Sequence, residues 1–275
     1  MLKQLEQIRL AISFLTLLPV SPRELASEES FARSIKYFSL AGLIFGLFNL
    51  AYLYLIQYSS LHGIDLFSQP WLIALGLLLI RLFLSGGLHL DGLMDSFDGI
   101  ACGRPTRGEI LTVMKDSRVG AFGSMAGTVC LLVQIVTLAN IDYRENFQIV
   151  VFLLFLMPAL SRLIMVLVIN LQVDSLDDKS SLSMFKKYQH TWLDIILNII
   201  WVKIAAWVFI ILIKLPFDKL VFCDLIIIPW IIISWIIYAW LKYKLKGHNG
   251  DSMGAGLEIS EGLFYCFLAI LFLIS

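Results

Sequence analysis

The stretch QIVVFLLFLMPALSRLIMVLVINL, residues 148–171, decides the fold class. It is 24 residues long and carries a single charged side chain, Arg162. A helix needs about 20 mostly apolar residues to cross the roughly 30 Å of hydrocarbon in a bilayer. The stretch therefore predicts a transmembrane helix, and Arg162 inside it is a functional candidate because charges are costly at that depth.

Similar apolar blocks recur along the whole chain. Apolar residues make up 59% of the 275 residues and charged ones only 15%, whereas soluble domains average about 25% charged residues. The sequence thus predicts an all-α fold, a polytopic integral membrane helical bundle in a single domain over residues 1–275. It excludes a soluble enzyme, and the zero net charge gives no field to attract nucleic acid. About seven spans are expected, at 37–58, 70–88, 119–141, 148–171, 192–213, 220–241 and 257–275.

The basic residues between these spans predict an orientation. Of the 21 Lys and Arg residues, 15 lie in the N-terminal segment and in loops 89–118, 172–191 and 242–256. Only three lie in the intervening loops, and cytoplasmic loops are the ones enriched in Lys and Arg. The N-terminus and every long polar loop are therefore expected on the cytoplasmic side. The segment ahead of the first span, which shows no small-residue cleavage site, is expected to be a retained amphipathic or re-entrant segment.

The loop SGGLHLDGLMDSFDGIACG, residues 85–103, carries three aspartates. Asp91, Asp95 and Asp98 follow the spacing i, i+4, i+7, which puts them on one face if the loop is helical. Carboxylates at that spacing repel one another, and a bound cation removes the repulsion. An all-oxygen set favours Mg²⁺ or Mn²⁺ over zinc. The alternative is a solvated helix face at the membrane rim.

His89 lies two residues before this cluster. It can be a metal ligand, a general base or an ordinary interfacial histidine. Arg81, about two turns before the cluster, is expected to reach it or to extend toward the interface. The pairs Gly42-x3-Gly46 and Gly123-x3-Gly127 are more typical of close helix packing than of chemistry.

The segment MKDSRVG, residues 114–120, immediately precedes the third span. Asp116 or Ser117 can cap that helix. Its free N–H groups, together with Lys115 and Arg118, predict a phosphate-binding corner. The alternative is ordinary basic flanking of a transmembrane helix.

A third polar cluster, GHNGDSMGAGLEISE at 247–261, leads into the last span. Glu258 is explained as an acidic residue in a first helical turn. Asp251, in a turn bracketed by glycines, has no such explanation and is a candidate for catalysis.

Three of these motifs together resemble the signatures of the cobalamin synthase family, the adenosylcobinamide-GDP ribazoletransferases of bacteria. They are GGLHLDGLMDSFDG at 86–99, MKDSRVG at 114–120, and GDSMGA with the following EISE at 250–261. They occur in the family's order and at similar spacing from the N-terminus to the last span. Such a set is far more specific than any single Asp cluster.

The resemblance implies a reaction, its substrates and a location. Adenosylcobinamide-GDP would react with α-ribazole or its 5′-phosphate to give adenosylcobalamin or its 5′-phosphate plus GMP. The enzyme would need Mg²⁺ and would lie in the bacterial inner membrane, in contact with the lipid bilayer. Assembly into a homo-oligomer is left open.

The resemblance also distributes roles among the candidate residues. The metal would be held by Asp91, Asp95 and Asp98. The catalytic candidates are His89, Asp116 and Asp251. Substrate and phosphate binding falls to Lys115, Arg118, Arg162, Asn249, Gly250 and Ser252.

Two other functions remain as alternatives. A CDP-alcohol-type membrane phosphotransferase also uses Asp clusters and Mg²⁺, but its Ala-Arg pair shortly after the first aspartates is missing here. A cation-coupled transporter would carry its carboxylates at the membrane midplane within repeated halves. Here they cluster at the expected cytoplasmic ends, and no repeat is visible.

Overall fold

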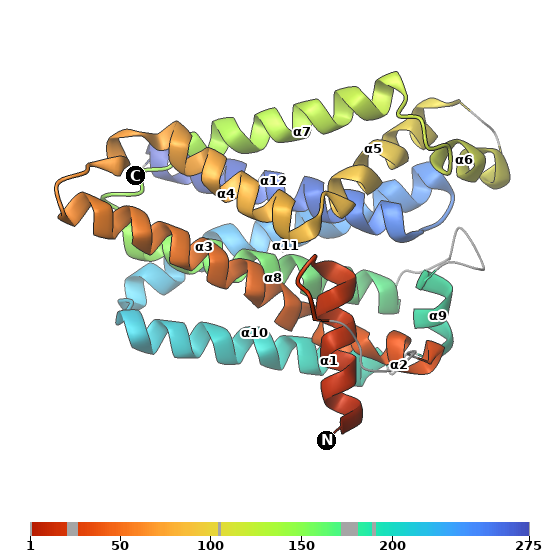
Figure 1. Ribbon diagram of the computed structural model, residues 1–275, viewed down its shortest axis with the longest axis horizontal. Coiled ribbons are helices and arrows are strands. Elements are labelled where there is room, and N and C mark those ends of the chain that lie inside the picture. Colours follow the sequence, from red (N-terminus) through yellow and green to blue (C-terminus); the bar gives the residue numbers. More distant parts are fainter. Residues whose placement is uncertain (1, 21–26, 104–105, 172–180, 189–190, 275) are drawn as a thin grey trace.

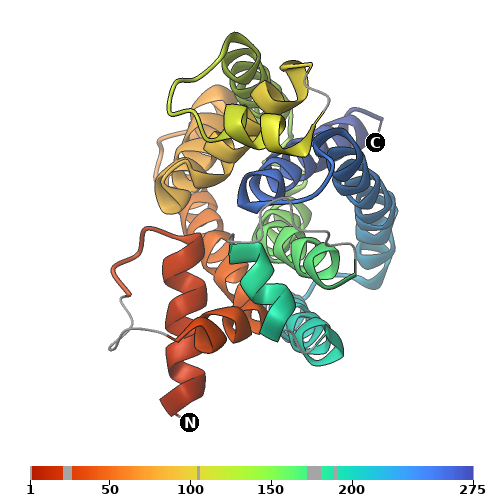
Figure 2. The same ribbon diagram turned by 90° about the vertical axis from the view of Figure 1, so that its right-hand side faces the viewer.

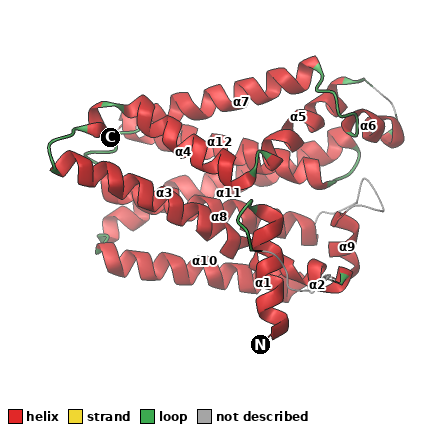
Figure 3. Cartoon of the chain, in the orientation of Figure 1, coloured by secondary structure: helices red, strands yellow, loops and turns green. Residues whose placement is uncertain are grey.

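The computed structural model describes residues 2–20, 27–103, 106–171, 181–188 and 191–274. Every regular element in these ranges is helical (Figure 3), which confirms the all-α prediction. Six helical segments are long and apolar enough to cross a membrane, and a bent pair brings the number to seven if it counts as one span. The loop 172–180, assigned above to the positively charged side, lies outside the described residues.

The long helices run side by side as a bundle (Figure 1). They alternate in direction, so the segments that join them gather at two ends. Six of them form most of the bundle: α3 Phe38–Leu61, α7 Ala121–Ala139, α8 Phe147–Leu171, α10 Thr191–Ile213, α11 Phe217–Leu245 and α12 Gly250–Ile274.

The shorter helices gather at one end of the bundle. Figure 2 looks onto this end, which carries α1 Leu2–Leu15, α2 Glu28–Ala32, α6 Arg107–Met114 and α9 Ser181–Tyr188. Helix α1 lies across the bundle rather than along it (Figure 1). All the basic segments counted above that the structure describes therefore share one end, called here the polar end.

Helix α8 forms the centre of the bundle, since nearly all of its span is buried. Its neighbour α3 approaches closely because a side chain at Gly42 or Gly46 would collide with the α8 backbone, which confirms the predicted role of this glycine pair. Pro158 cannot donate a hydrogen bond to the carbonyl of Leu154, four residues back. Asn49 of α3 donates to that carbonyl instead, at 3.1 Å.

The predicted span 70–88 is broken. Helix α4, Pro70–Ser85, ends within the bundle. Helix α5, Leu88–Ala101, follows it at an angle of 85° to α4. Gly86 and Gly87 between them both have left-handed backbones, with φ of 62° and 74°. Glycine adopts this conformation without steric cost, so this pair allows the sharp bend.

The first long helix, α3, begins at Phe38, one residue from the expected start at 37. The helical segment that contains it extends further toward the N-terminus, to Glu28, through the 3-10 helix η1, Arg33–Tyr37. Another expected boundary shifts. The last helix begins at Gly250 and not at 257. Asp251 thus lies in its first turn rather than in a separate loop, and Glu258 lies about two turns inside the helix instead of opening it.

Candidate active site

The three aspartates predicted to share a helical face lie on α5, as expected from their spacing. Asp91 is exposed, whereas Asp95 and Asp98 are partly buried. The Asp95 carboxylate is repelled by Asp91, by Asp98 and by Asp251 from the last helix. The structure therefore gathers four aspartates from two helices, with Asp95 among the other three.

Close packing of α5 on α12 brings Asp251 to the cluster. A Cβ at Gly92 would lie 2.7 Å from the backbone oxygen of Asp251, so only glycine fits at this contact. Gly254, one turn further along α12, meets the backbone of His89 in the same way at 3.1 Å. Glycine on each helix thus sets the separation of the two acidic segments.

The residues around Asp251 hold the start of α12. Asn249 Oδ1 accepts a hydrogen bond from the Ser252 N–H at 2.9 Å, in the manner of an N-cap, and its Nδ2 donates to Asp251 at 2.8 Å. The Ser252 hydroxyl accepts from the Asn249 N–H at 2.9 Å. Asn249 and Ser252, predicted to bind substrate, are therefore engaged in shaping this turn, while Gly250 is exposed.

Asp98 caps the N-terminus of α7. Its two carboxylate oxygens accept hydrogen bonds from the N–H groups of Gly120 and Gly123, at 2.7 and 2.8 Å. Gly123 also leaves the space that the carboxylate occupies. The expected cap by Asp116 or Ser117 is absent, since Gly120 is the N-cap residue of α7. The predicted anion site at this helix terminus is thus filled by a carboxylate of the protein itself.

Asp116 and Arg118 pair with each other beside this cap. The guanidinium donates to the carboxylate at 2.8 and 3.1 Å, and the Arg118 N–H adds a bond of 3.0 Å. These hydrogen bonds lower the pKa of Asp116 to about 2. Lys115, exposed at the end of α6, exerts an electrostatic attraction on Asp251. Of the predicted phosphate-binding cations, Lys115 and Arg118 therefore lie at the polar end.

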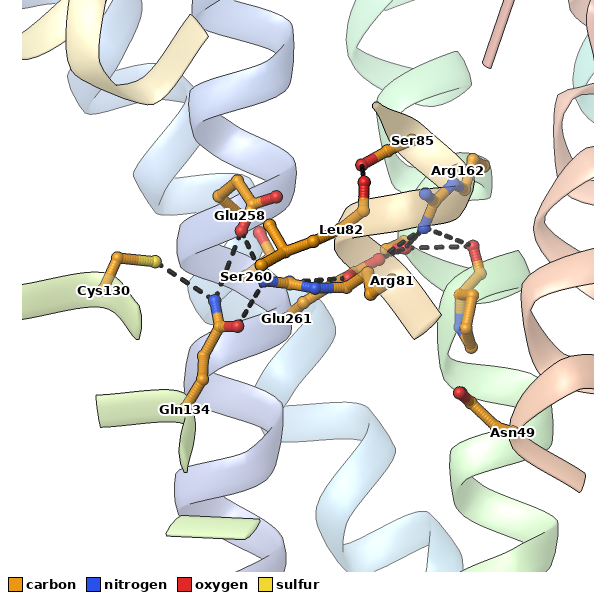
Figure 4. A network of polar contacts seen from close by, with 12 residues as sticks. Asn49, Arg81, Leu82, Ser85, Cys130, Gln134, Arg162, Glu258, Ser260 and Glu261 are labelled. Atoms are coloured by element: carbon orange, nitrogen blue, oxygen red, sulfur yellow. Dashed lines mark hydrogen bonds and ion pairs between the residues drawn. The ribbon is translucent and has the colours of Figure 1, made fainter. Parts of the chain in front are cut away.

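Arg162 and Arg81 lie elsewhere, in a buried ionic network (Figure 4). Arg81 pairs with Glu258 at 2.8 Å and with Glu261 at 3.0 Å. Arg162, fully buried, pairs with Glu261 and stacks its guanidinium 4.5 Å from the ring centre of Phe45. The expectation that Arg81 reaches the aspartates or the interface is wrong, because it turns into the bundle to neutralise α12.

Two further polar side chains complete this network. Gln134 of α7 accepts a hydrogen bond from Arg81 and donates to Glu258 at 3.3 Å. Ser161 donates to Glu261 at 2.7 Å. Two arginines and two glutamates from α4, α8 and α12 thus balance in charge inside the bundle, with α7 attached through Gln134.

The two glutamates and Gln134 were not among the predicted functional residues. The sequence did contain a signal for the glutamates: two arginines inside predicted spans each require an acidic partner. Placing the start of the last helix at 257 concealed that signal, because it explained Glu258 as a residue of a first turn.

Two cavities open beside the first turn of α5. The larger, of about 520 Å³, is lined by polar and small groups that include Thr16, Ser85, Gly87 and Asp91. The smaller, of about 200 Å³, has mostly apolar walls and is also lined by His89 and Asp251. Phe14 and Leu88 line both, so the first turn of α5 separates the two spaces.

The positions of the four aspartates decide how the predicted metal ion could be held. Among the described residues, no three His, Cys, Asp or Glu side chains are grouped tightly enough to hold a metal ion by themselves. Mg²⁺, however, is usually bound through one or two carboxylates together with waters and substrate phosphates. Asp91 and Asp95, one helical turn apart on α5, fit that kind of partial site.

The fold and the site define a polytopic helical membrane protein with an aspartate cluster and two cavities at the polar end of its bundle. The chain belongs to the cobalamin-5-phosphate synthase family, which matches residues 7–269. This finding confirms the family resemblance seen in the sequence. No solved structure matches the chain significantly.

Curated relatives carry one shared name, adenosylcobinamide-GDP ribazoletransferase. The protein of Desulfitobacterium hafniense (strain Y51) is 38% identical over 160 residues, which cover 58% of each chain. That of Brevibacillus brevis is 40% identical over 133 residues, 48% of this chain and 50% of the relative. In these two matches the chain spans 50–58% of the relative's length. The protein of Clostridioides difficile (strain 630) is 26% identical over 262 residues, 95% of this chain and 96% of the relative.

Proposed function

We propose that the protein is an adenosylcobinamide-GDP ribazoletransferase, as its curated relatives are named. The observation that carries the proposal is the meeting of α5 and the start of α12, where four aspartates cluster. Two of them line the cavities, Asp91 the larger and Asp251 the smaller. A transfer between two substrates needs two adjoining binding spaces and a group of charges where they meet. The substrates would be adenosylcobinamide-GDP and α-ribazole or its 5′-phosphate.

In the reaction, a ribose hydroxyl of the acceptor attacks the phosphorus that carries the cobinamide. The pyrophosphate bond breaks, GMP leaves, and the hydroxyl proton passes to a base. Asp251 is the base in this proposal, because it lines the smaller cavity and lies beside the aspartates of α5. Asp116 is less suited, since its low pKa makes it a weak proton acceptor.

Asp91 and Asp95 would hold Mg²⁺, and Asp98 would keep α7 in place beside them. When bound, Mg²⁺ would neutralise charge on the phosphates of the nucleotide. Lys115, exposed and near enough to attract Asp251, is positioned to contact the same phosphates. Arg118 could contact them as well, if its guanidinium leaves Asp116 and binds a phosphate.

We assign two residues to roles other than those predicted. Arg162 is buried and paired with Glu261, so we assign it to holding α8 against α12 rather than to phosphate binding. His89 lies in the wall of the smaller cavity, and its role is taken up below.

We further propose that the chain forms one domain in the inner membrane and that the polar end faces the cytoplasm. The distribution of 15 basic residues on this side against three on the other supports that orientation. Nucleotide substrates would then reach the aspartates from the cytoplasm. A homo-oligomer is compatible with this arrangement but is not required by it.

The test is release of GMP from adenosylcobinamide-GDP by detergent-purified protein. GMP is expected only when both α-ribazole 5′-phosphate and Mg²⁺ are present, and EDTA should stop its release. Absence of GMP from folded protein in every condition would reject the proposal. Transfer onto a lipid-type alcohol would then indicate the CDP-alcohol phosphotransferase, and uptake into proteoliposomes without GMP would indicate the transporter.

A further inference from the structure

The smaller cavity has the features of a binding site for an aromatic ring. Three phenylalanines line it, Phe14 of α1, Phe38 of α3 and Phe185 of α9. Phe38 and Phe185 meet edge to face with ring centres 5.6 Å apart, and Phe14 stacks on Phe38 at 5.9 Å. Aromatic side chains arranged in this way offer both faces and edges to a further ring.

One residue of the wall, His89, carries a polar atom that has no partner within the described part of the chain. His89 is 4% exposed, and its Nε2 is buried without a hydrogen bond to any described residue. A buried nitrogen left in this state costs free energy, and a ligand in the cavity can remove that cost. The imidazole nitrogen can donate or accept a hydrogen bond, depending on its tautomer.

The size of the cavity limits the ligand. An engineered apolar cavity of about 150 Å³ binds benzene, so about 200 Å³ suits a flat system of two fused rings. Asp251 lines the cavity and also belongs to the acidic cluster. These features suit an apolar system of two fused rings that contains a nitrogen and carries a polar group next to Asp251.

We propose that this cavity binds the benzimidazole base of the ribazole acceptor and that His89 Nε2 hydrogen-bonds its free ring nitrogen. This proposal rests on the proposed function, because the ribazole is known only from the names of the relatives. It places the ribose beside Asp251, between the base and the aspartates of α5. His89 is then a specificity-determining residue and not the general base.

Binding of benzimidazole itself tests the site without any reaction. Titration calorimetry would compare the wild-type protein in detergent with Ile169→Trp, which fills the cavity from α8, and with Leu171→Trp. Leu171 is a matched control, because it lies on the same helix, does not line the cavity and is 50% exposed. We expect Ile169→Trp to weaken binding by about tenfold or more through steric exclusion, and Leu171→Trp to bind like the wild type.

A second variant and a second probe keep the test decisive. Should Ile169→Trp unfold, Ile169→Phe adds a single ring at the same position. Indole, similar in size but without an acceptor nitrogen in its ring, should bind more weakly than benzimidazole, and His89→Leu should remove that difference. Equal binding of benzimidazole to the wild type and a folded Ile169 variant, or no binding to the wild type, would overturn the proposal.

The outcome is separable from that of the proposed function. If GMP is released by the wild type, a folded Ile169 variant should raise the KM for α-ribazole 5′-phosphate while leaving that for adenosylcobinamide-GDP unchanged. His89→Gln should likewise change KM for the acceptor more than kcat, whereas loss of a general base lowers kcat. GMP release with an unchanged acceptor KM in these variants would overturn the cavity assignment and leave the transferase proposal intact.

Discussion

Single carboxylates at the polar end serve different purposes despite their proximity. Asp98 gives both oxygens to the N-terminus of α7, whereas Asp91 is exposed beside the larger cavity. The spacing of the aspartates predicted their common helix. It could not predict the cap, because the hydrogen bonds join residues 22 and 25 positions apart.

The cap gives Asp98 a measurable structural role. Replacing Asp98 by Ala should lower the free energy of unfolding by about 1–2 kcal/mol, because two N–H groups lose a charged acceptor. Denaturant unfolding in detergent, followed by circular dichroism, measures this loss. Glu145→Ala, an exposed change in the loop after α7, should have little effect. An Asp98→Ala protein as stable as that control would contradict the assigned cap.

The Asp116–Arg118 pair makes a prediction about pH. The pKa of Asp116 is depressed to about 2, so its carboxylate is ionised at higher pH and becomes protonated only as the pH falls through that value. The acid limb of a pH–rate profile near neutral pH therefore belongs to another group. Asp116→Asn should leave the midpoint of that limb unchanged, whatever it does to the maximal rate. A shifted midpoint would assign the titrating base to Asp116.

At the scale of elements, the break between α4 and α5 positions the site. Hydropathy predicted one span over 70–88, since the apolar content of a segment indicates how long a helix can be and not where the chain bends. The left-handed backbones of the two glycines at the break are visible only in the structure. The predicted start of α12 was seven residues too late, because the polar residues at 247–256 resemble a loop.

Gly87 and Gly63 provide a matched pair for testing the break. Both have positive φ, 74° and 91°, and both have open space where a Cβ would lie. Alanine at either position should cost about 1 kcal/mol of stability through backbone strain alone. Only Gly87→Ala should also lower the rate of GMP release, because it disturbs α5, while Gly63 lies at the opposite end. Equal rates in the two variants would show that the bend does not position the aspartates.

Across the whole molecule, the buried ionic network joins the polar end to the body of the bundle. Four helices meet at Arg81, Arg162, Glu258, Glu261 and Gln134 (Figure 4). The number of spans and the side on which polar segments gather could be predicted from composition and charge. The pairing of helices could not, because it depends on contacts between residues 99 or more positions apart.

Removing one charge from this network should destabilise the protein strongly. Glu261→Gln leaves two buried arginines with one carboxylate, at an expected cost of about 3–5 kcal/mol. Glu29→Gln, in the exposed pair with Arg33 at 2.7 Å, should cost less than about 1 kcal/mol. The double change Glu261→Leu with Arg162→Met should recover much of the loss, since both charges are then removed. Thermal unfolding of the four proteins in one detergent compares them, and similar losses for the two single variants would contradict the network's role.

In the proposed mechanism, GMP release depends on the aspartates of α5. The most direct measurement is the rate of that release by the wild type and by Asp95→Asn over a range of Mg²⁺ concentrations, with Asp65→Asn as a control at the opposite end of the bundle. We predict a loss of about 100-fold or more for Asp95→Asn, an unchanged rate for Asp65→Asn, and equal unfolding temperatures. A near-normal rate from Asp95→Asn at every Mg²⁺ concentration would contradict the assignment of the active site.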